Sequence, residues 1–435
     1  MKKYCFICCS KAFFRLLNFD TLKNIISGYV LTNMFLFINM NTFAQINGYV
    51  KPGFESVYDA FKINFDAGKE LGAALCVYHK GEKVIDLWGG IANKKTKSLW
   101  DEKTLVLFYS TTKGVASLCI AKLHSEGKID YDQAVATYWN DFGKNGKENI
   151  TVRQLLSHQS GLCLWEGNLS VSELAERNKL VKKLEDAIPY WIPGDYCGYS
   201  AALVGHYMSE IIRRIDEKHR SLGQYFQEEI AKPLGIEFYI GLPDSIGDER
   251  MASIEMNNPI KRLFMLNKSP KGLIKKMINP NSLCFKSFTL VKGYNVNERE
   301  TWRIEEPSGN GIGTAESLAK LYSAFSLGAK ELGIQHTTLS ECESSALHPK
   351  FSDVDKVMGI PLYYRNGFMK NGEGSNPFPN DACYGFGGAS GSMAFADPVN
   401  QIGYCYVPNR MGYDFPDSRE GDIQKALYAC IKKLN

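Results

Sequence analysis

Residues 107–123 read LFYSTTKGVASLCIAKL, with a serine and a lysine three positions apart at the head of an apolar segment. Ser110 and Lys113 then lie on one face if the segment is helical, so that an amine is held beside a hydroxyl. Gly127 is placed to end this helix. Its buried stripe is predicted to consist of Val115, Leu118, Cys119 and Leu123. The S-x-x-K pattern alone is weak, because it occurs by chance in many chains of this length.

The composition is that of a globular protein with a large core. The chain has 435 residues, 44% hydrophobic and 23% charged, a size that suggests two or three structural units. Its net charge of +4 arises within residues 1–50, where five basic residues stand against Asp20. The rest is formally neutral, which argues against a nucleic-acid-binding protein, since that class usually has a net basic surface. The partner that we expect is a small-molecule substrate.

The cysteines indicate a reducing compartment. Three of the twelve, Cys5, Cys8 and Cys9, cluster near the N-terminus, and nine are scattered with irregular spacing. No histidine follows any of them at a metal-ligand interval, so we interpret the nine as buried free thiols, which favours an intracellular protein. Cys5-x-x-Cys8 has no second half-site. We predict neither a metal nor any other cofactor.

Residues 1–50 are interpreted as an extension outside the fold. The apolar run IISGYVLTNMFLFINM, at 25–40, is interrupted by Asn33 and Asn39 and is short for a membrane span. It fits a signal-peptide core or a signal anchor, and Thr42-Phe43-Ala44 is similar to a cleavage site. Residues 25–44 therefore leave a membrane-anchored or secretory form open beside the intracellular one, with membrane association through residues 1–50.

The order of predicted elements indicates an α+β fold. A helix at 54–67 is followed by two strands that flank Gly81-Glu82, a hairpin signal. Residues 110–240 are mostly helical, and the end of the chain returns to strands and a helix. The individual predictions are helices at 151–162, 201–214 and 420–434 and strands at 392–398 and 401–409. We expect one catalytic domain, 51–435, in which an antiparallel sheet is flanked by helices and carries an inserted helical subdomain. A cleft would form at the seam between the two.

Residues 256–297 differ from the rest because they hold eight Lys or Arg and no acid. One interpretation is a lid, or a patch that contacts anionic lipid. The other, which we favour, is a solvated surface insertion.

Three further strings accompany the first motif, in a fixed order. They are LLSHQSGL (155–162), PGDYCGYSAALVGHY (193–207) and CYGFGGASGSMAFADP (383–398). Together with STTK they resemble the serine β-lactamase-like family over about residues 50–435. That family contains class C β-lactamases, penicillin-binding D-alanyl-D-alanine carboxypeptidases, family VIII carboxylesterases and the β-lactamase-like proteins of animals. The resemblance implies the β-lactamase/transpeptidase-like fold and a serine hydrolase.

The resemblance also implies site residues. Its S-x-x-K motif falls on Ser110 and Lys113 as nucleophile and lysine, and its tyrosine motif falls on Tyr199. Its third motif, K-T-G or H-x-G, falls on Phe386-Gly387-Gly388, so phenylalanine stands where the family has Lys or His. A second departure is Ala201, at a position that is often Asn. The family's oxyanion donors map to the N–H groups of Ser110 and Ala389.

The chemistry of these groups supports acyl transfer. A serine hydroxyl needs a neighbouring base, and Lys113 can serve only if burial keeps its amine neutral. Tyr199 is a second group able to move a proton, especially as a phenolate beside Lys113. Gly387 and Gly388 let the backbone approach the substrate closely. For His158 and Asp195 we expect structural roles.

Position 386 bears on the substrate. A phenylalanine there cannot pair with a carboxylate but can pack on an apolar acyl or alcohol group, which favours an ester or lipid-like substrate over a β-lactam. Two alternatives stay open: an amidase or peptidase for small peptides, and a catalytically weak scaffold protein that keeps the fold. The departures at 201 and 386 favour the scaffold, whereas the intact Ser110, Lys113 and Tyr199 argue against it.

Overall fold

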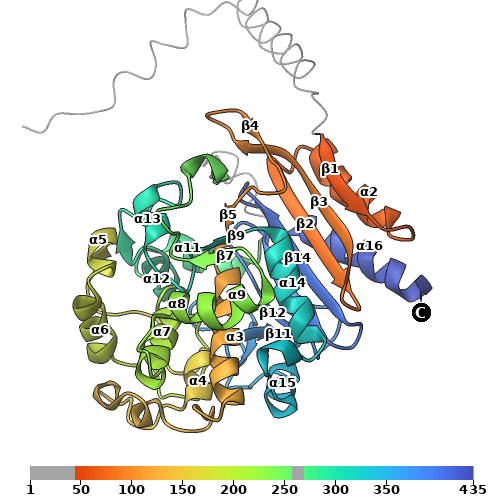
Figure 1. Ribbon diagram of the computed structural model, residues 1–435. Helices are drawn as coiled ribbons and strands as arrows, with labels where there is room; N and C mark the ends of the chain where they lie inside the picture. The colour runs from red at the N-terminus through yellow and green to blue at the C-terminus, as the bar shows by residue number, and fades with distance from the viewer. Residues whose placement is uncertain (1–44, 257–268, 435) are drawn as a thin grey trace, which may run out of the picture. The chain divides into compact units, whose positions relative to one another are not determined.

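The computed structural model describes residues 45–256 and 269–434 (Figure 1). The predicted signal or anchor segment at 25–44 and the cysteines at 5, 8 and 9 lie outside the described residues. The described residues from Ile46 onward form one compact unit. Five residues of the predicted extension belong to this unit, because strand β1 (Ile46–Val50) pairs with β3.

The main sheet has nine antiparallel strands and joins the two ends of the described chain. Its order is β1-β3-β2-β14-β13-β12-β11-β10, with β4 on β3. The strands are β2 (Gly72–His79), β3 (Glu82–Asn93), β4 (Ser98–Leu99), β10 (Tyr363–Arg365), β11 (Phe368–Lys370), β12 (Tyr384–Gly387), β13 (Met393–Asp397) and β14 (Ile402–Pro408). The predicted hairpin is confirmed, and it turns at Lys80 and Gly81, whose φ angles of 53° and 82° suit a tight hairpin turn. The pairing of β14 with β2 closes the sheet as the α+β prediction requires.

Helices cover both faces of this sheet. Helices α2 (Glu55–Asp66) and α16 (Ser418–Leu434) pack on each other, and α14 (Ala315–Ser326) packs on β2, β13 and β14 (Figure 1). Figure 1 shows the α2–α16 pair and α14 on opposite sides of the strands. The helices predicted at 54–67 and 420–434 are thus confirmed.

The chain between 110 and 240 is mostly helical, as predicted. It contains α3 (Thr111–Ser125), α4 (Val152–Leu156), α5 (Val171–Leu174), α6 (Arg177–Asp186), α7 (Leu203–Ile215), α8 (Leu222–Phe226) and α9 (Lys232–Leu234), with the short strand β6 (Leu169–Ser170). A small sheet of β5 (Val106–Leu107), β9 (Gly311–Gly313) and β7 (Phe238–Ile240) borders the start of α3. The remaining elements are α11 (Lys271–Ile278), α12 (Leu283–Phe288), β8 (Val291–Lys292), α13 (Arg299–Arg303) and α15 (His336–Glu343).

Helix α3 is central rather than amphipathic. The predicted stripe is buried, but so is nearly every other residue of the helix, because α3 runs between the sheet on one side and α7 and α8 on the other (Figure 1). Gly114 makes this packing possible, since a Cβ there would lie 2.2 Å from the Tyr322 hydroxyl and 3.4 Å from the Phe386 Cβ. The helix ends at Ser125, and Gly127 follows with a φ of 68°. The predicted helix is therefore confirmed, but the prediction of a single buried stripe was incomplete, because nearly the whole helix is buried.

The helix predicted at 151–162 is shorter than expected. Thr151 caps it as predicted, in a reciprocal capping box with Gln154, but α4 ends at Leu156. His158 has a φ of 59°, which no helical residue adopts, and the chain turns there toward the region of Tyr199. The predicted stop at Gly161 is therefore wrong by five residues.

The described part of the basic segment at 256–297 folds onto the body of the protein. Leu273 of α11, Cys284 of α12 and Leu290 are buried in the main core. Gly272 abuts Gly359, where a Cβ on Gly272 would lie 2.3 Å from the Gly359 oxygen. These contacts hold the described part of the segment against the protein.

The nine cysteines within the described residues are free and buried, as predicted. Among the described residues, no group of three or more His, Cys, Asp or Glu side chains is arranged to hold a metal ion. None of the described helices combines the length and the apolar character that a membrane crossing requires.

Candidate active site

Ser110 stands at the N-terminal end of α3, half-buried, directly after a strained residue. Tyr109 has a φ of 50°, a conformation that is rare for a bulky side chain and is typical of functional turns. The Thr112 hydroxyl stabilises this turn by donating to the Tyr109 oxygen at 2.6 Å and accepting from the Gly311 N–H at 2.8 Å. The turn presents Ser110 Oγ to two side chains, which were both predicted as its partners.

Lys113 is fully buried, and its amine has three neighbours. Nζ lies 2.7 Å from the carbonyl oxygens of Ala201 and Ser308 and 3.1 Å from Ser110 Oγ. Carbonyl oxygens can only accept, so two N–H groups of the amine point at them. A neutral amine has only one lone pair, and the third direction, toward Ser110, is the one left for it. The geometry thus aims that lone pair at the serine hydroxyl.

Burial lowers the pKa of Lys113 from 10.5 to about 7, and the Glu306 carboxylate opposes that fall. Glu306 is itself buried, which raises its pKa, while Lys113 lowers it. Glu306 accepts a hydrogen bond from the Ser308 N–H at 3.0 Å, and so supports the residue whose carbonyl holds Lys113. Its other charged neighbour would be His206 at 3.8 Å, but burial lowers the pKa of His206 to about 4, so that imidazole is neutral.

Tyr199 donates its hydroxyl hydrogen to Ser110 Oγ at 2.6 Å. Burial raises the pKa of Tyr199 well above its ordinary value, and the hydrogen bond to Ser110 only partly opposes this. The phenol form is therefore favoured over the phenolate, the form in which the sequence led us to consider Tyr199 most able to move a proton.

The backbone around Tyr199 is held from two sides. Its N–H donates to the buried Asp355 carboxylate at 2.8 Å, and the next N–H, that of Ser200, donates to His158 Nδ1 at 3.1 Å. Because Nδ1 accepts, the neutral His158 carries its proton on Nε2. His158 thus has the structural hydrogen-bonding role that was predicted. The N–H of Asp195 likewise donates within its turn, to the Ile192 oxygen at 3.0 Å.

Phe386 lies in the site but not where the sequence suggested. Its side chain is only 2% exposed and stacks on Tyr199 and Tyr364, with ring centroids 6.2 and 6.0 Å apart. Lys113 Nζ lies 5.9 Å from its ring centre. A ring covered in this way presents almost no surface to a substrate, so the expected substrate contact is not supported. Phe386 instead excludes water from the Lys113–Tyr199 pair.

The turn from β12 to β13 brings Gly387, Gly388 and Ala389 to the start of α3. A Cβ on Gly388 would lie 2.4 Å from the Phe108 oxygen, so only glycine allows this approach, whereas Gly387 is less confined. The Ser392 hydroxyl fastens the turn, since it donates to the Phe108 oxygen at 2.9 Å. Ala389 is exposed, and its N–H has no acceptor among the described residues. That N–H is therefore available to an oxyanion.

Four further residues shape the site and were missed in the sequence: Glu306, Ser308, Asp355 and Ser392. Glu306, Ser308 and Asp355 come from loops outside the quoted strings, whereas Ser392 lies within the string 383–398 but had no predicted role. Only Glu306 had a local signal, as an acidic residue just before the turn-forming Pro-Ser-Gly-Asn-Gly run.

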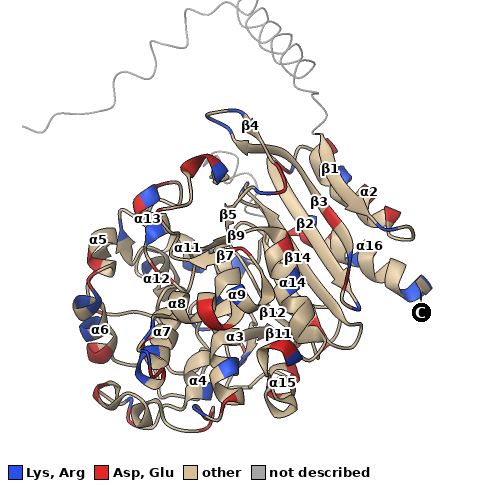
Figure 2. Cartoon of the chain, in the orientation of Figure 1, with Lys and Arg blue, Asp and Glu red and all other residues tan. Residues whose placement is uncertain are grey.

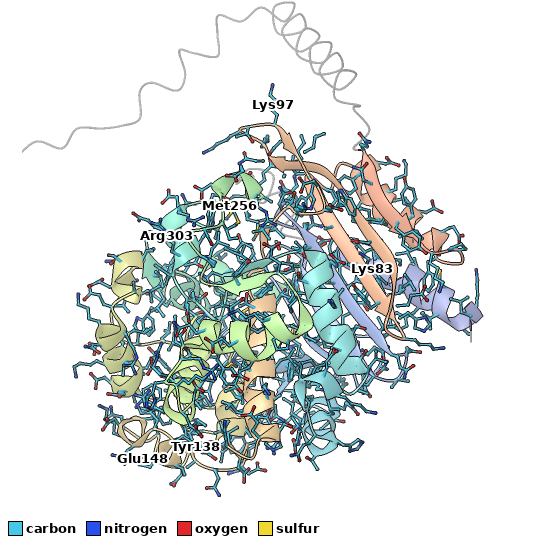
Figure 3. All side chains as sticks on the ribbon, in the orientation of Figure 1. Lys83, Lys97, Tyr138, Glu148, Met256 and Arg303 are labelled. Carbon is cyan, nitrogen blue, oxygen red and sulfur yellow. The ribbon has the colours of Figure 1, made fainter. Side chains whose placement is uncertain are left out.

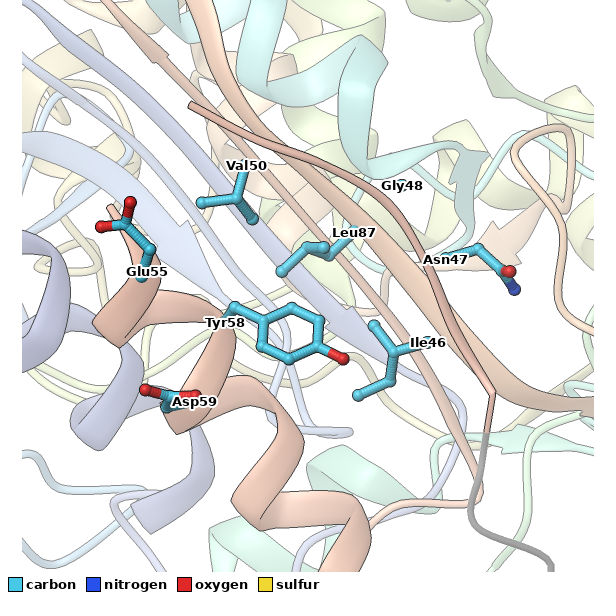
Figure 4. Close-up of a pocket in the computed structure, with 8 residues that line it drawn as sticks. All are labelled: Ile46, Asn47, Gly48, Val50, Glu55, Tyr58, Asp59 and Leu87. Atoms are coloured by element: carbon cyan, nitrogen blue, oxygen red, sulfur yellow. The ribbon is translucent and has the colours of Figure 1, made fainter. Parts of the chain in front are cut away.

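A cavity of about 510 Å³ lies elsewhere, between β1 and α2 (Figure 4). Glu55, Tyr58 and Asp59 are its reactive side chains, without a serine or lysine. Strand β1 is at one edge of the sheet, and β3, β2, β14 and β13 separate it from β12. This cavity is thus a different place from the Ser110 site.

Comparison with known proteins agrees with the motifs. The sequence profile of the beta-lactamase family matches residues 58–428. The esterase/beta-lactamase LipL of Mycobacterium tuberculosis is 29% identical over 370 residues, which cover 84% of this chain and 83% of LipL. A family VIII carboxylesterase structure has a TM-score of 0.76 and 34% identity, covering 89% of this chain and all of that one. A penicillin-binding protein homologue from Caulobacter crescentus has a TM-score of 0.76 and 32% identity over the same shares of the two chains.

The profile covers most of the chain, and the structural neighbours have the β-lactamase/transpeptidase-like fold predicted from the four motifs. The resemblance stated from the sequence is therefore confirmed. The chain belongs to the beta-lactamase family of hydrolase enzymes.

Proposed function

We propose that this protein is an esterase that cleaves an acyl ester through a covalent intermediate on Ser110. One observation carries the proposal: a buried lysine amine and a phenol both lie within 3.1 Å of the Ser110 oxygen. A scaffold protein has no need to hold a buried lysine amine and a phenol against the same serine hydroxyl. The names of two relatives, an esterase/beta-lactamase and a family VIII carboxylesterase, support the same class of reaction.

The chemistry follows from the positions of the two groups. The neutral Lys113 amine takes the hydroxyl proton as Ser110 Oγ attacks the acyl carbon. The carbonyl oxygen becomes an oxyanion that accepts from the N–H groups of Ser110 and Ala389. The C–O bond to the alcohol then breaks, and Tyr199 donates its proton to the leaving alkoxide. The proton on Lys113 then passes to the Tyr199 phenolate. Deacylation repeats these steps, with water in the place of Ser110 as the nucleophile and Ser110 in the place of the alcohol as the leaving group.

The substrate class is inferred from what surrounds the reacting groups. The family places a Lys or His where this chain has Phe386, and such a cation pairs with a substrate carboxylate. Phe386 removes that partner, and its buried ring leaves the pair of Lys113 and Tyr199 in apolar surroundings. A neutral acyl ester is therefore favoured over a β-lactam or a peptide carboxylate.

An active-site probe tests the covalent step. A fluorophosphonate should label the full chain, mass spectrometry should locate the adduct on Ser110, and Ser110→Ala should abolish the labelling. Ser117→Ala is a matched control, because Ser117 lies on the same helix and donates to the Lys113 oxygen at 2.8 Å, away from the amine. Labelling that persists in Ser110→Ala would overturn the proposed nucleophile.

Substrate choice is tested with matched leaving groups. Hydrolysis of nitrophenyl acyl esters of increasing chain length is expected to exceed that of the corresponding nitroanilides and of nitrocefin. Faster hydrolysis of the anilide would identify an amidase, the second reading of the motifs. Turnover of the β-lactam at a rate comparable with that of a short ester would refute the substrate class.

A further inference from the structure

The described residues 269–297 form a surface of unusual charge, which we call the basic face. They include α11, α12 and β8 and contain five lysines and no Asp or Glu. The five are Lys271, Lys275, Lys276, Lys286 and Lys292. The net positive charge of this short segment therefore exceeds the net charge of the whole chain, which is +4.

The positive charge of the basic face is not balanced by neighbouring acidic side chains. On α6 both signs lie side by side (Figure 2), and Lys182 pairs with Asp186 at 2.8 Å. By contrast, none of the five lysines forms an ion pair with any described residue. Their charge is not neutralised locally, and it is available to an anionic partner.

Large apolar side chains are exposed on the same two helices. Ile278 is 66% exposed, Phe288 52%, and Met277 and Phe285 37% each. Phe285 and Phe288 are three residues apart on α12 and therefore share one face. Inward-facing Leu273 and Cys284 fix the two helices to the core, so the outer side chains are held in place. Basic and apolar groups exposed on the same two helices are the combination that binds an anionic lipid interface.

The basic face adjoins the active site. The Phe288 ring centroid lies 6.5 Å from that of Tyr199, whose hydroxyl contacts Ser110 Oγ. A partner seated on α12 is thus one aromatic ring away from the reacting groups. A lipid bilayer is the partner whose chemistry matches both features, since it offers anionic headgroups to the lysines and hydrocarbon to Phe288 and Ile278.

We propose that the basic face docks this enzyme on an anionic lipid bilayer and that acyl substrates enter the Ser110 site from that surface beside Phe288. The entry of substrate rests on the proposed esterase function, whereas the docking does not. Nucleic acid would match the lysines but leaves the four exposed apolar side chains without a role, so a bilayer is favoured.

Vesicle sedimentation tests the docking with the full chain. We expect binding to vesicles of phosphatidylcholine with 30% phosphatidylserine, weaker binding to phosphatidylcholine alone, and a decrease with added salt. Each lysine near an anionic surface contributes about fivefold to binding. Lys275→Gln with Lys286→Gln should therefore weaken binding to the anionic vesicles by roughly 25-fold.

A matched control uses two lysines that are also exposed and form no ion pair with the described residues. Lys95→Gln with Lys97→Gln removes the same charge from the turn between β3 and β4, where Lys97 projects outward (Figure 3). Residues 1–44 are the same in every variant, so they cannot account for a difference between the two pairs. An equal loss in both pairs, or wild-type binding to an oligonucleotide and not to vesicles, would overturn the proposal.

The apolar contribution and the esterase reaction are separated by two further measurements. Phe288→Ser with Ile278→Ser should weaken binding to both kinds of vesicle by more than tenfold, and unchanged binding would contradict the insertion of these side chains. The lysine variant should hydrolyse a short soluble ester at the wild-type rate. Vesicle binding without any esterase activity would reject the proposed function and keep the docking, whereas ester hydrolysis without vesicle binding would do the reverse.

Discussion

Two lysines in different regions of this protein have nearly the same surroundings, but only one of them is placed to act as a general base. Lys113, at the head of α3, and Lys370, on β11, are both buried with no carboxylate in contact among the described residues. Each donates to two backbone carbonyl oxygens. Burial lowers both pKa values, to about 7 for Lys113 and about 8 for Lys370.

The third neighbour distinguishes them. Lys113 Nζ lies 3.1 Å from the Ser110 hydroxyl, whereas Lys370 Nζ faces the Tyr384 ring, 5.7 Å from its centre. Burial between carbonyls lowers the pKa of an amine toward physiological pH, but a neutral amine becomes a general base only where a hydroxyl occupies its remaining direction. A shifted pKa alone therefore does not identify a catalytic lysine.

The largest expected effect tests this comparison directly. Lys113→Met should lower kcat for ester hydrolysis by about 10³-fold or more, because it removes the base while keeping an apolar chain of similar length. Lys370→Met should leave kcat within about threefold of wild type, since no reacting group is near it. Steady-state hydrolysis of a nitrophenyl ester measures both, with circular dichroism to verify folding. Similar losses in the two variants would show that burial, and not the hydroxyl contact, is what matters.

Tyr199→Phe should have a smaller effect. It removes the proton donor to the leaving group but keeps the ring stacked on Phe386, and we expect kcat to fall by about 10²-fold. The loss should shrink with better leaving groups, such as nitrophenol against an aliphatic alcohol, because these need no proton. Tyr364→Phe is the control, since its ring stacks on that of Tyr199 at 6.1 Å, and it should change kcat little. A loss independent of the leaving group would exclude Tyr199 as the acid.

The pH profile sharpens the comparison further. The active form of Lys113 is the amine, so kcat/KM should fall tenfold per pH unit below about pH 7. The Glu306 carboxylate raises the pKa of Lys113, so Glu306→Gln should move this acid limb to lower pH by about one unit. Glu305→Gln is a matched control, because Glu305 accepts from Ser221 and the Gly223 N–H. An acid limb that stays in place in Glu306→Gln would show that Lys113 does not set it.

How far the sequence leads can be judged from the same residues. Ser110, Lys113 and Tyr199 lie in short motifs, each anchored by local signals such as the helix start and the Pro-Gly turn, and the structure brings all three together. Glu306 and Asp355 are far from these motifs in the sequence, and their loops reach the site only when the chain is folded. No periodicity or spacing in one sequence encodes such a meeting.

The errors have physical reasons as well. Phe386 was placed in contact with substrate because its aligned counterparts are charged and reach the substrate, but an uncharged ring is more stable when buried, and here it stacks on Tyr199. The helix after Thr151 is predicted to stop at Gly161 because glycine commonly ends helices, but His158 takes a left-handed conformation that the helix cannot pass. Lys370 lies in a short strand without any motif, so nothing in its neighbourhood predicted a buried amine.

The smallest expected effect concerns stability and returns to Lys370. The pKa of this lysine is about 8 when folded and 10.5 ordinarily, so between pH 8 and 10.5 the unfolded chain binds more protons than the native protein. Its contribution to the free energy of unfolding therefore rises with pH in that window, by up to about 1.4 kcal/mol per unit. Lys370→Met lacks this term, so wild type should gain about 1–2 kcal/mol on the variant between pH 8 and 9.5 in urea unfolding. Lys97→Met, at an exposed position, should show no such change, and parallel behaviour of all three proteins would mean that Lys370 is not buried as an amine.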